Sequence, residues 1–125
     1  MKKISVSVFM LFFLSASAYA ADWQKYGAND YGIFYYDKES VVPGGLDNIV
    51  RFQGKRQHRD SEDHTLRLYE FNCLHGAYRV VKCEIRTKDS SLIGYCGTFD
   101  WEKIPSNTYT QDLYKSLCAK IRGMR

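Results

Sequence analysis

The stretch YRVVKCEIRTKDSSLIGYCGT, residues 78–98, decides the fold of this chain. Residues 78–87 and 92–98 are rich in strand-forming side chains, and the Lys-Asp-Ser-Ser segment at 88–91 between them has the composition of a turn. The stretch therefore predicts a β-hairpin. If the turn is centred on positions 89 and 90, two residues face each other across the hairpin when their numbers add up to 179.

In this register Cys83 faces Cys96. Facing Cα atoms of antiparallel strands lie about 4.5 to 5.5 Å apart, which suits a disulfide. The four cysteines formally allow three connectivities, but this hairpin leaves Cys73 for Cys118. Their spacing contains neither the paired short intervals of a zinc site nor a redox-active C-x-x-C. We therefore predict two structural disulfides and no metal held by cysteine.

The N-terminus predicts an export signal over residues 1–20. Two lysines precede a mainly apolar run over residues 4–14, and Ala18-Tyr19-Ala20 fits a small-x-small cleavage site. The run is shorter than the roughly 20 apolar residues of a membrane span, and no cysteine at the cleavage site offers a lipid attachment point. The alternative is an uncleaved anchor. We expect a periplasmic or secreted protein with no membrane anchor after cleavage, its residues 21–125 forming a single domain.

Composition narrows the class of partner. Without its first 20 residues the chain keeps 16 basic against 14 acidic side chains, a net charge of about +2. Such a small excess does not indicate a nucleic-acid partner. A domain of this size buries about two thirds of its unfolded surface, so disulfides would add useful stability.

The remaining segments complete the predicted architecture. Strands are expected at residues 23–28, 33–37, 48–58 and 65–73, with Gly54 as a candidate bulge. After Pro105 the period changes, because apolar residues then recur every four positions from Tyr109 to Ile121, which predicts an amphipathic helix. We therefore predict an α+β fold, in which an antiparallel sheet of about six strands is covered by one C-terminal helix and held by two disulfides.

The ends of that helix also have signals. Thr108, with Gln111 three residues later, forms a candidate capping box, and Gly123 is a candidate stop.

Several short segments together resemble the bacterial surface-adhesin protein E family, and the resemblance extends from Asp22 to Cys118. They are EFNC (70–73), YRV (78–80), WEKIP (101–105), LYKSLC (113–118), the early DW (22–23), and YYD (35–37) with Ser40.

The resemblance implies the same fold and a family cysteine pair at Cys73 and Cys118, with Cys83 and Cys96 as an addition. The founding member of that family is a lipid-anchored outer-membrane adhesin that binds host proteins such as vitronectin and laminin. The loops at 38–47 and 59–64 show no ligand-binding motif that could be carried over.

A basic stripe is the first candidate binding feature. Arg51, Lys55 and Arg59 recur every four residues, so in a strand they would share one face, with Arg56 and Arg67 nearby. Such a stripe attracts phosphate groups, sulfated polysaccharide or acidic protein segments. The alternative is a solvated face that guards an exposed strand.

A charged loop is the second candidate. His58, Asp60, Glu62 and His64 recur at every second position, so a fully extended segment would point all four the same way and could hold a divalent ion. The alternative is a solvated loop, and we predict no metal and no other cofactor.

The prediction of function rests on one exposed tyrosine and on the absence of catalytic motifs from the sequence. Tyr31, beside Gly32 in a turn, is expected to be exposed as a contact residue. We find no nucleophile elbow, phosphate loop or metalloprotease motif, so no catalytic residues are assigned. The leading hypothesis is a non-enzymatic module that binds a protein or extracellular-matrix ligand through loops and one tyrosine-bearing sheet face. The alternative is a periplasmic accessory protein, such as a hydrolase inhibitor or an immunity protein.

Overall fold

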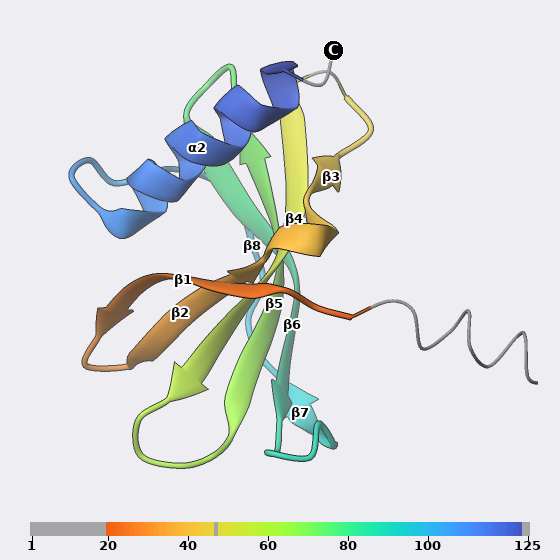
Figure 1. Ribbon diagram of the computed structural model, residues 1–125, viewed down its shortest axis with the longest axis vertical. Coiled ribbons are helices and arrows are strands. Elements are labelled where there is room, and N and C mark those ends of the chain that lie inside the picture. Colours follow the sequence, from red (N-terminus) through yellow and green to blue (C-terminus); the bar gives the residue numbers. More distant parts are fainter. Residues whose placement is uncertain (1–19, 47, 124–125) are drawn as a thin grey trace, which may run out of the picture.

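The computed structural model describes residues 20–46 and 48–123, so the export signal predicted at residues 1–20 lies outside the described part except for Ala20. It shows an antiparallel sheet with one C-terminal helix packed on it, which confirms the predicted fold class (Figure 1). In chain order the elements are β1 (Trp23–Asn29), β2 (Gly32–Asp37), a 3-10 turn η1 (Lys38–Ser40), β3 (Val42–Pro43), β4 (Ile49–His58), β5 (His64–Asn72), β6 (Ala77–Arg86), β7 (Leu92–Tyr95), β8 (Phe99–Lys103) and α2 (Tyr109–Gly123).

The sheet has eight strands, six of which follow the order β1-β2-β4-β5-β6-β7. The two strands that sequence patterns did not indicate, β3 and β8, attach to the side of this path, where β3 pairs with β4 and β8 pairs with β6. β7 and β8 bond to opposite ends of β6, at residues 84–86 and 77–80 respectively. One long strand thus carries two short ones in succession.

The hairpin has the predicted register next to the disulfide, but a one-residue shift between Ile85 and Arg86 pairs Arg86 with Leu92, where the prediction gave Ile93. Glu84 pairs with Tyr95 and Ile85 with Gly94, and the N–H of Cys96 donates to the carbonyl of Cys83 at 3.1 Å. The Cys83 and Cys96 Cα atoms lie 5.0 Å apart and are disulfide-bonded. The second disulfide joins Cys73 to Cys118 with a Cα separation of 5.7 Å and ties the end of β5 to α2. Both predicted disulfides are confirmed, and they are compatible with an oxidising periplasmic or extracellular environment.

Strand alternation divides the sheet into two faces. Val50 and Phe52 of β4, with Phe71 of β5, pack in one buried cluster with Leu113 and Leu117 of α2. We call this side the covered face. Residues at the intervening positions of the same strands point away from α2, and we call that side the free face. Burying one large apolar side chain contributes about 1.5 to 3 kcal/mol, so the covered face holds the fold together.

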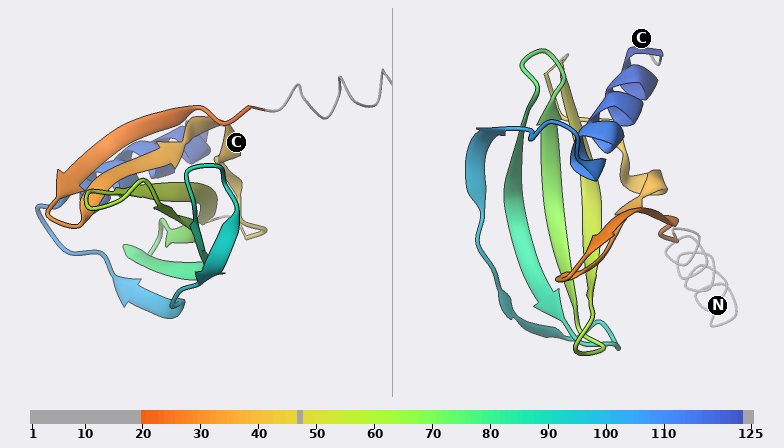
Figure 2. Two further views of the ribbon diagram at one scale, coloured as in Figure 1. Left: turned by 90° about the horizontal axis from the view of Figure 1, so that it is seen from below. Right: turned by 90° about the vertical axis from the view of Figure 1, so that its left-hand side faces the viewer.

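The covered face is concave. Tyr26 of β1 and Phe99 of β8 belong to strands at opposite ends of the sheet, yet both line the same cavity. This is possible only because the sheet curves, as both views of Figure 2 show. In the right-hand view, α2 and the β1–β2 hairpin stand on the same side of the long strands.

Gly54 is not a bulge. It pairs without interruption with Tyr36 on one side and with Arg67 on the other. A Cβ atom at this position would lie 2.6 Å from the ring of Tyr69, so the glycine is needed to let that ring lie over the strand.

The helix begins as predicted, with one difference in its cap. The Gln111 N–H donates to the Thr108 hydroxyl at 3.2 Å, whereas the Gln111 side-chain oxygen accepts from the N–H of Asn107 at 3.0 Å instead of from that of Thr108. Asn107 has a φ of +59°, which turns its N–H toward the helix. The helix ends at Gly123.

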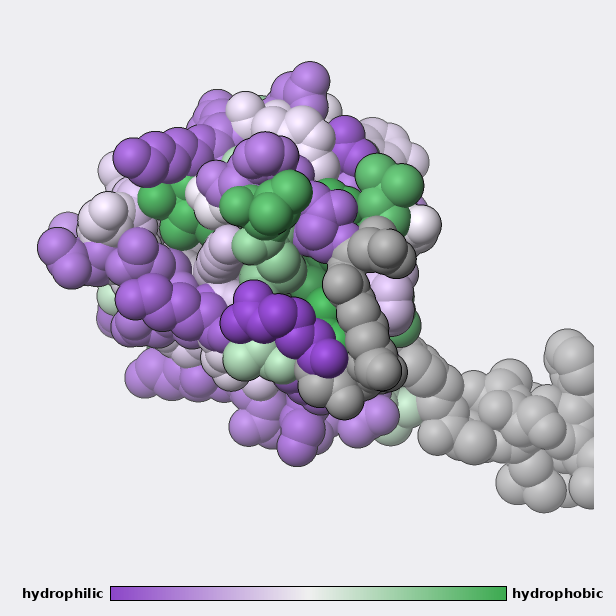
Figure 3. All heavy atoms as spheres, turned by 90° about the horizontal axis from the view of Figure 1, so that it is seen from above, coloured by the Kyte–Doolittle hydropathy of each residue, from purple (hydrophilic) through white to green (hydrophobic). Residues whose placement is uncertain are grey.

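The end of the molecule that Figure 3 views from above is mainly hydrophilic, with apolar side chains in separate small groups. Among the residues that the structure describes, no helix is both long enough and apolar enough to cross a membrane.

Candidate functional site

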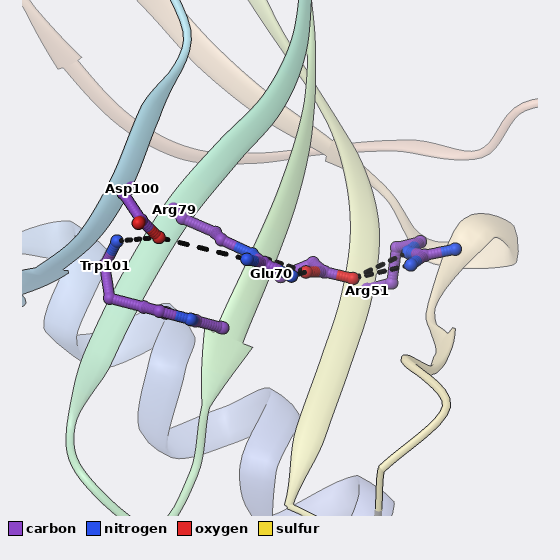
Figure 4. A network of polar contacts seen from close by, with 5 residues as sticks. All are labelled: Arg51, Glu70, Arg79, Asp100 and Trp101. Atoms are coloured by element: carbon purple, nitrogen blue, oxygen red, sulfur yellow. Dashed lines mark hydrogen bonds and ion pairs between the residues drawn. The ribbon is translucent and has the colours of Figure 1, made fainter.

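The free face carries a buried carboxylate held between two arginines (Figure 4). Glu70 lies on β5, between Arg51 on β4 and Arg79 on β6 in the strand register. Its oxygen Oε2 accepts from Arg51 Nε at 2.9 Å and Nη2 at 2.6 Å, and Oε1 accepts from Arg79 Nε at 2.7 Å and forms an ion pair with Arg79 Nη2 at 2.6 Å. Each arginine therefore contacts one carboxylate oxygen through two nitrogens, a geometry that fixes both guanidinium planes.

Burial and charge act in opposite directions on this carboxylate. The Glu70 side chain is only 1% exposed, and this burial raises its pKa. The hydrogen bonds and charges of Arg51 and Arg79 lower the pKa by more than burial raises it, so the net shift is downward. Glu70 is therefore ionised at neutral pH. The two arginine side chains remain 45% and 35% exposed, so both guanidinium groups are accessible to a partner.

The row continues onto β8. The Arg79 guanidinium lies over the ring of Trp101 at 4.5 Å and reaches Asp100 at 3.9 Å, while the backbone N–H of Trp101 donates to Asp100 Oδ1 at 2.8 Å. Figure 4 shows these side chains aligned across three strands and β8. We call Arg51, Glu70, Arg79, Asp100 and Trp101 the arginine row.

A second cation lies further along the same face. Lys55 Nζ sits 4.5 Å from the ring of Trp23 and 5.3 Å from that of Tyr35. Partial burial lowers the pKa of Lys55. Neither this tryptophan nor Trp101 belongs to the apolar core, and each packs against a cation from another strand.

The predicted basic stripe is only partly one surface. Arg51 and Lys55 lie on the free face, as expected, because they are four residues apart in β4. Arg59 lies beyond the end of that strand, where its Nε donates to the carbonyl of Asn29 at 2.6 Å. It therefore ties the β4–β5 loop to the β1–β2 turn.

The two arginines expected near the stripe are not on its face. Arg56 occupies the alternate position in β4, and Arg67 pairs with Gly54, so both project on the covered face. Tyr31 lies at the β1–β2 turn, 73% exposed, and its N–H donates to Asn29 Oδ1 at 2.8 Å. Tyr31 and Arg59 are thus neighbours of one turn, separate from the arginine row.

The charged loop does not align its four side chains. Residues 59–62 form a bend between β4 and β5, so the extended spacing is lost. Position 58 falls on the covered face, where His58 Nε2 bonds to Thr65 Oγ1 at 2.7 Å, whereas His64 pairs with Gln57 on the free face. Burial lowers the pKa of both histidines. Within residues 20–46 and 48–123, no three His, Cys, Asp or Glu side chains lie close enough to hold a metal ion.

Sequence reasoning missed the centre of the arginine row. Glu70 lies between Tyr69 and Phe71 in an otherwise apolar stretch, and that isolated carboxylate was the available signal. Its partners could not be found, because they depend on strand pairing across 19 and 9 residues. Most tyrosines, including Tyr26 and Tyr114, pack against the core of the covered face, so the free face is not rich in tyrosine.

No protein-family model matches the chain, and no curated protein or solved structure matches it significantly.

Proposed function

We propose that this chain is an exported, non-enzymatic binding module that recognises a protein or extracellular-matrix ligand through the free face of its sheet. The observation that carries the proposal is the arginine row, in which two arginines are fixed by carboxylates and packed beside one indole, on a face that no helix of the described residues covers (Figure 4). The resemblance of the chain to the surface-adhesin protein E family supports the same class of function.

The chemistry of the row suits protein recognition. Arginine and tryptophan are enriched among the residues that dominate binding energy at protein interfaces. Both arginines are already held by Glu70, so little side-chain entropy is lost when a partner binds them. A preorganised row of this kind favours affinity over adaptability.

The charge of the free face defines the partner. Glu70 is 1% exposed and its charge is used internally, while Lys82 Nζ pairs with Glu84 at 2.9 Å and keeps 63% of its side chain exposed. A partner therefore meets the cations Arg51, Lys55, Arg79 and Lys82, and at the β8 end of the row it also meets the Asp100 carboxylate, which is 89% exposed. An acidic protein segment complements the four cations.

Location decides which partners are possible, so fractionation is the first experiment. The proposal expects the protein at the cell surface or in the medium, where a host ligand is accessible. A protein confined to the periplasm would contradict a host adhesin, and capture of a partner from envelope extract would then support the periplasmic accessory role.

Binding to immobilised vitronectin and laminin then tests the free face directly. We expect Trp101→Ala to weaken binding at least tenfold, because tryptophan is among the residues that dominate binding energy at protein interfaces. Binding should also weaken as salt increases, because it depends on exposed cations. Lys120→Ala, an exposed cation on α2, is the matched control and should stay within about twofold. Equal losses in both variants would contradict an interface at the arginine row.

A further inference from the structure

The covered face contains a cavity of about 170 Å³ below the first turn of α2. It is bounded by the β1–β2 hairpin and by strands β5, β6 and β8, and its wall is largely aromatic, with Tyr26, Phe34, Tyr69, Tyr78, Phe99 and Tyr109. An apolar cavity of about 150 Å³ is large enough to bind benzene. The size of this one therefore fits a ligand with a single aromatic ring.

One cation lines this aromatic wall. Arg67 reaches the cavity from β5, and its Nη1 lies 3.4 Å from the hydroxyl of Tyr69. No carboxylate in the part of the chain that the structure describes forms an ion pair with it. A partly buried guanidinium without an anionic partner is costly, so an anion would stabilise this position.

A second arginine adjoins the first. Arg56 pairs with Thr65 and Arg67 with Gly54, which makes the two arginines diagonal neighbours on one face. Arg56 Nε is buried and has no hydrogen-bond partner among the described residues. Arg56 does not line the cavity itself but adjoins it through a crevice with no room for a ligand, which shares Tyr26, Phe34, Arg67 and Tyr69 with the cavity. No acidic side chain of the described residues lines either space.

The tyrosine hydroxyls around the cavity add hydrogen-bond donors. Burial raises the pKa of Tyr26 well above its ordinary value and raises that of Tyr78. Both phenols are therefore protonated at neutral pH, and that of Tyr26 already forms a side-chain hydrogen bond with Tyr69. Phenol and guanidinium donors beside aromatic rings form the pattern that recognises a ring carrying a carboxylate.

We propose that this cavity binds a small aromatic carboxylate, with its ring among the aromatic side chains and its carboxylate on Arg67 next to Arg56. The site lies on the covered face, whereas the proposed protein partner contacts the free face. Each proposal can therefore fail without the other.

The test is a titration of the disulfide-bonded exported protein with phenylacetate at neutral pH, followed by backbone amide shifts in NMR. We expect saturable changes at residues that line the cavity, with a dissociation constant of about 1 mM or lower, which is within reach of a ligand of about ten heavy atoms. Phenylacetamide, which lacks the charge, should bind about tenfold more weakly or worse, because hydrogen bonds to charged groups are the stronger ones. Sodium sulfate, which lacks the ring, should also bind about tenfold more weakly.

Variants locate the charge. Arg67→Met should weaken phenylacetate binding at least tenfold and Arg56→Met by about threefold, whereas Lys120→Met removes an equal charge from α2 and should stay within about twofold. The comparison of phenylacetate with phenylacetamide uses only the unmodified protein, so it remains valid if a variant does not fold. Equal affinity for the two compounds would overturn the proposal. Full affinity in Arg67→Met, equal binding of sulfate, or no saturable change up to about 10 mM phenylacetate would also overturn it.

Discussion

The two faces of the sheet treat a pair of arginines in opposite ways. On the free face Arg51 and Arg79 share the buried carboxylate of Glu70, which two nitrogens of each arginine contact. On the covered face Arg56 and Arg67 lie beside an aromatic cavity, and neither forms an ion pair with a carboxylate of the described residues. The first pair is completed within the fold, while the second has donors available for a ligand. Arg51 and Arg79 are therefore held in place for the proposed protein partner, whereas Arg56 and Arg67 remain open to a small ligand.

The largest effect on stability should come from removing the disulfide that ties α2 to the covered face of the sheet. Replacing both Cys73 and Cys118 with alanine should lower the free energy of unfolding by about 4 kcal/mol, against about 3 kcal/mol when Cys83 and Cys96 are replaced. The first disulfide closes the longer loop, with 45 residues of separation against 13. Urea unfolding of the two double variants measures the difference. The opposite order would show that chain entropy does not dominate.

The next effect tests the completed arginine pair. Glu70→Gln should lower the free energy of unfolding by about 3 kcal/mol at pH 7, because it leaves two guanidinium groups without their shared anion. The exposure of both arginines keeps the loss at the lower end of the range for a broken buried ion pair. Chemical denaturation measures it, and a loss no larger than that of the surface control Lys120→Ala would contradict a structural role for Glu70.

The same contact should respond to acid. The pKa of Glu70 is lowered in the folded state, so its stabilisation is complete above its ordinary value of 4.5 and is lost as the pH falls through the lowered folded value. The stability difference between the unmodified protein and Glu70→Gln should therefore be constant near neutrality and shrink below pH 4.5. A series of urea titrations across pH measures this, and a difference that grows in acid would contradict the assigned shift.

A smaller effect is expected at the edge of the arginine row. Trp101→Ala should lower the free energy of unfolding by only about 1 kcal/mol, because it removes one exposed cation–π contact and leaves the Glu70 pairs intact. The variant should lose partner binding much more than stability. Thermal melting and the vitronectin and laminin assays, made on the same preparation, separate the two.

The smallest effect distinguishes the arginine pairs most directly. Arg67→Met should change the free energy of unfolding by less than about 0.5 kcal/mol, since the side chain has one long hydrogen bond and no ion pair to lose. Urea unfolding measures it. A loss as large as that of Glu70→Gln would show that Arg67 is held within the fold as firmly as Arg79 is.

Local patterns were sufficient for much of the architecture. The turn at residues 88–91 determined the hairpin register and, through it, both disulfides, while the four-residue apolar period located α2. β8 was missed because Phe99–Lys103 is short and mixes aromatic with charged side chains, so it has no clear strand pattern. Its strand conformation is stabilised by hydrogen bonding to β6. Local signals do not report such tertiary pairing.

The candidate sites were less accessible for the same reason. Arg51 and Lys55 could be assigned to one face by counting, but Arg59 required the exact end of β4. Arg56 and Arg67 were expected only near the stripe, and the strand register places both on the opposite face of the sheet. Residues of β1 and β8 line one cavity because the sheet is curved. This curvature depends on the whole sheet, so no single segment of the sequence predicts it.

The two margins of the sheet also bear on how the protein behaves at high concentration. At one margin β7 and β8 divide the length of β6 between them, so neither presents a long row of open N–H and carbonyl groups. At the other, the pairing of β1 with β2 is interrupted by a bulge between Lys25 and Gly27. Short and kinked margins are poor templates for a strand from another molecule. The chain should therefore resist edge-to-edge aggregation even where it is crowded.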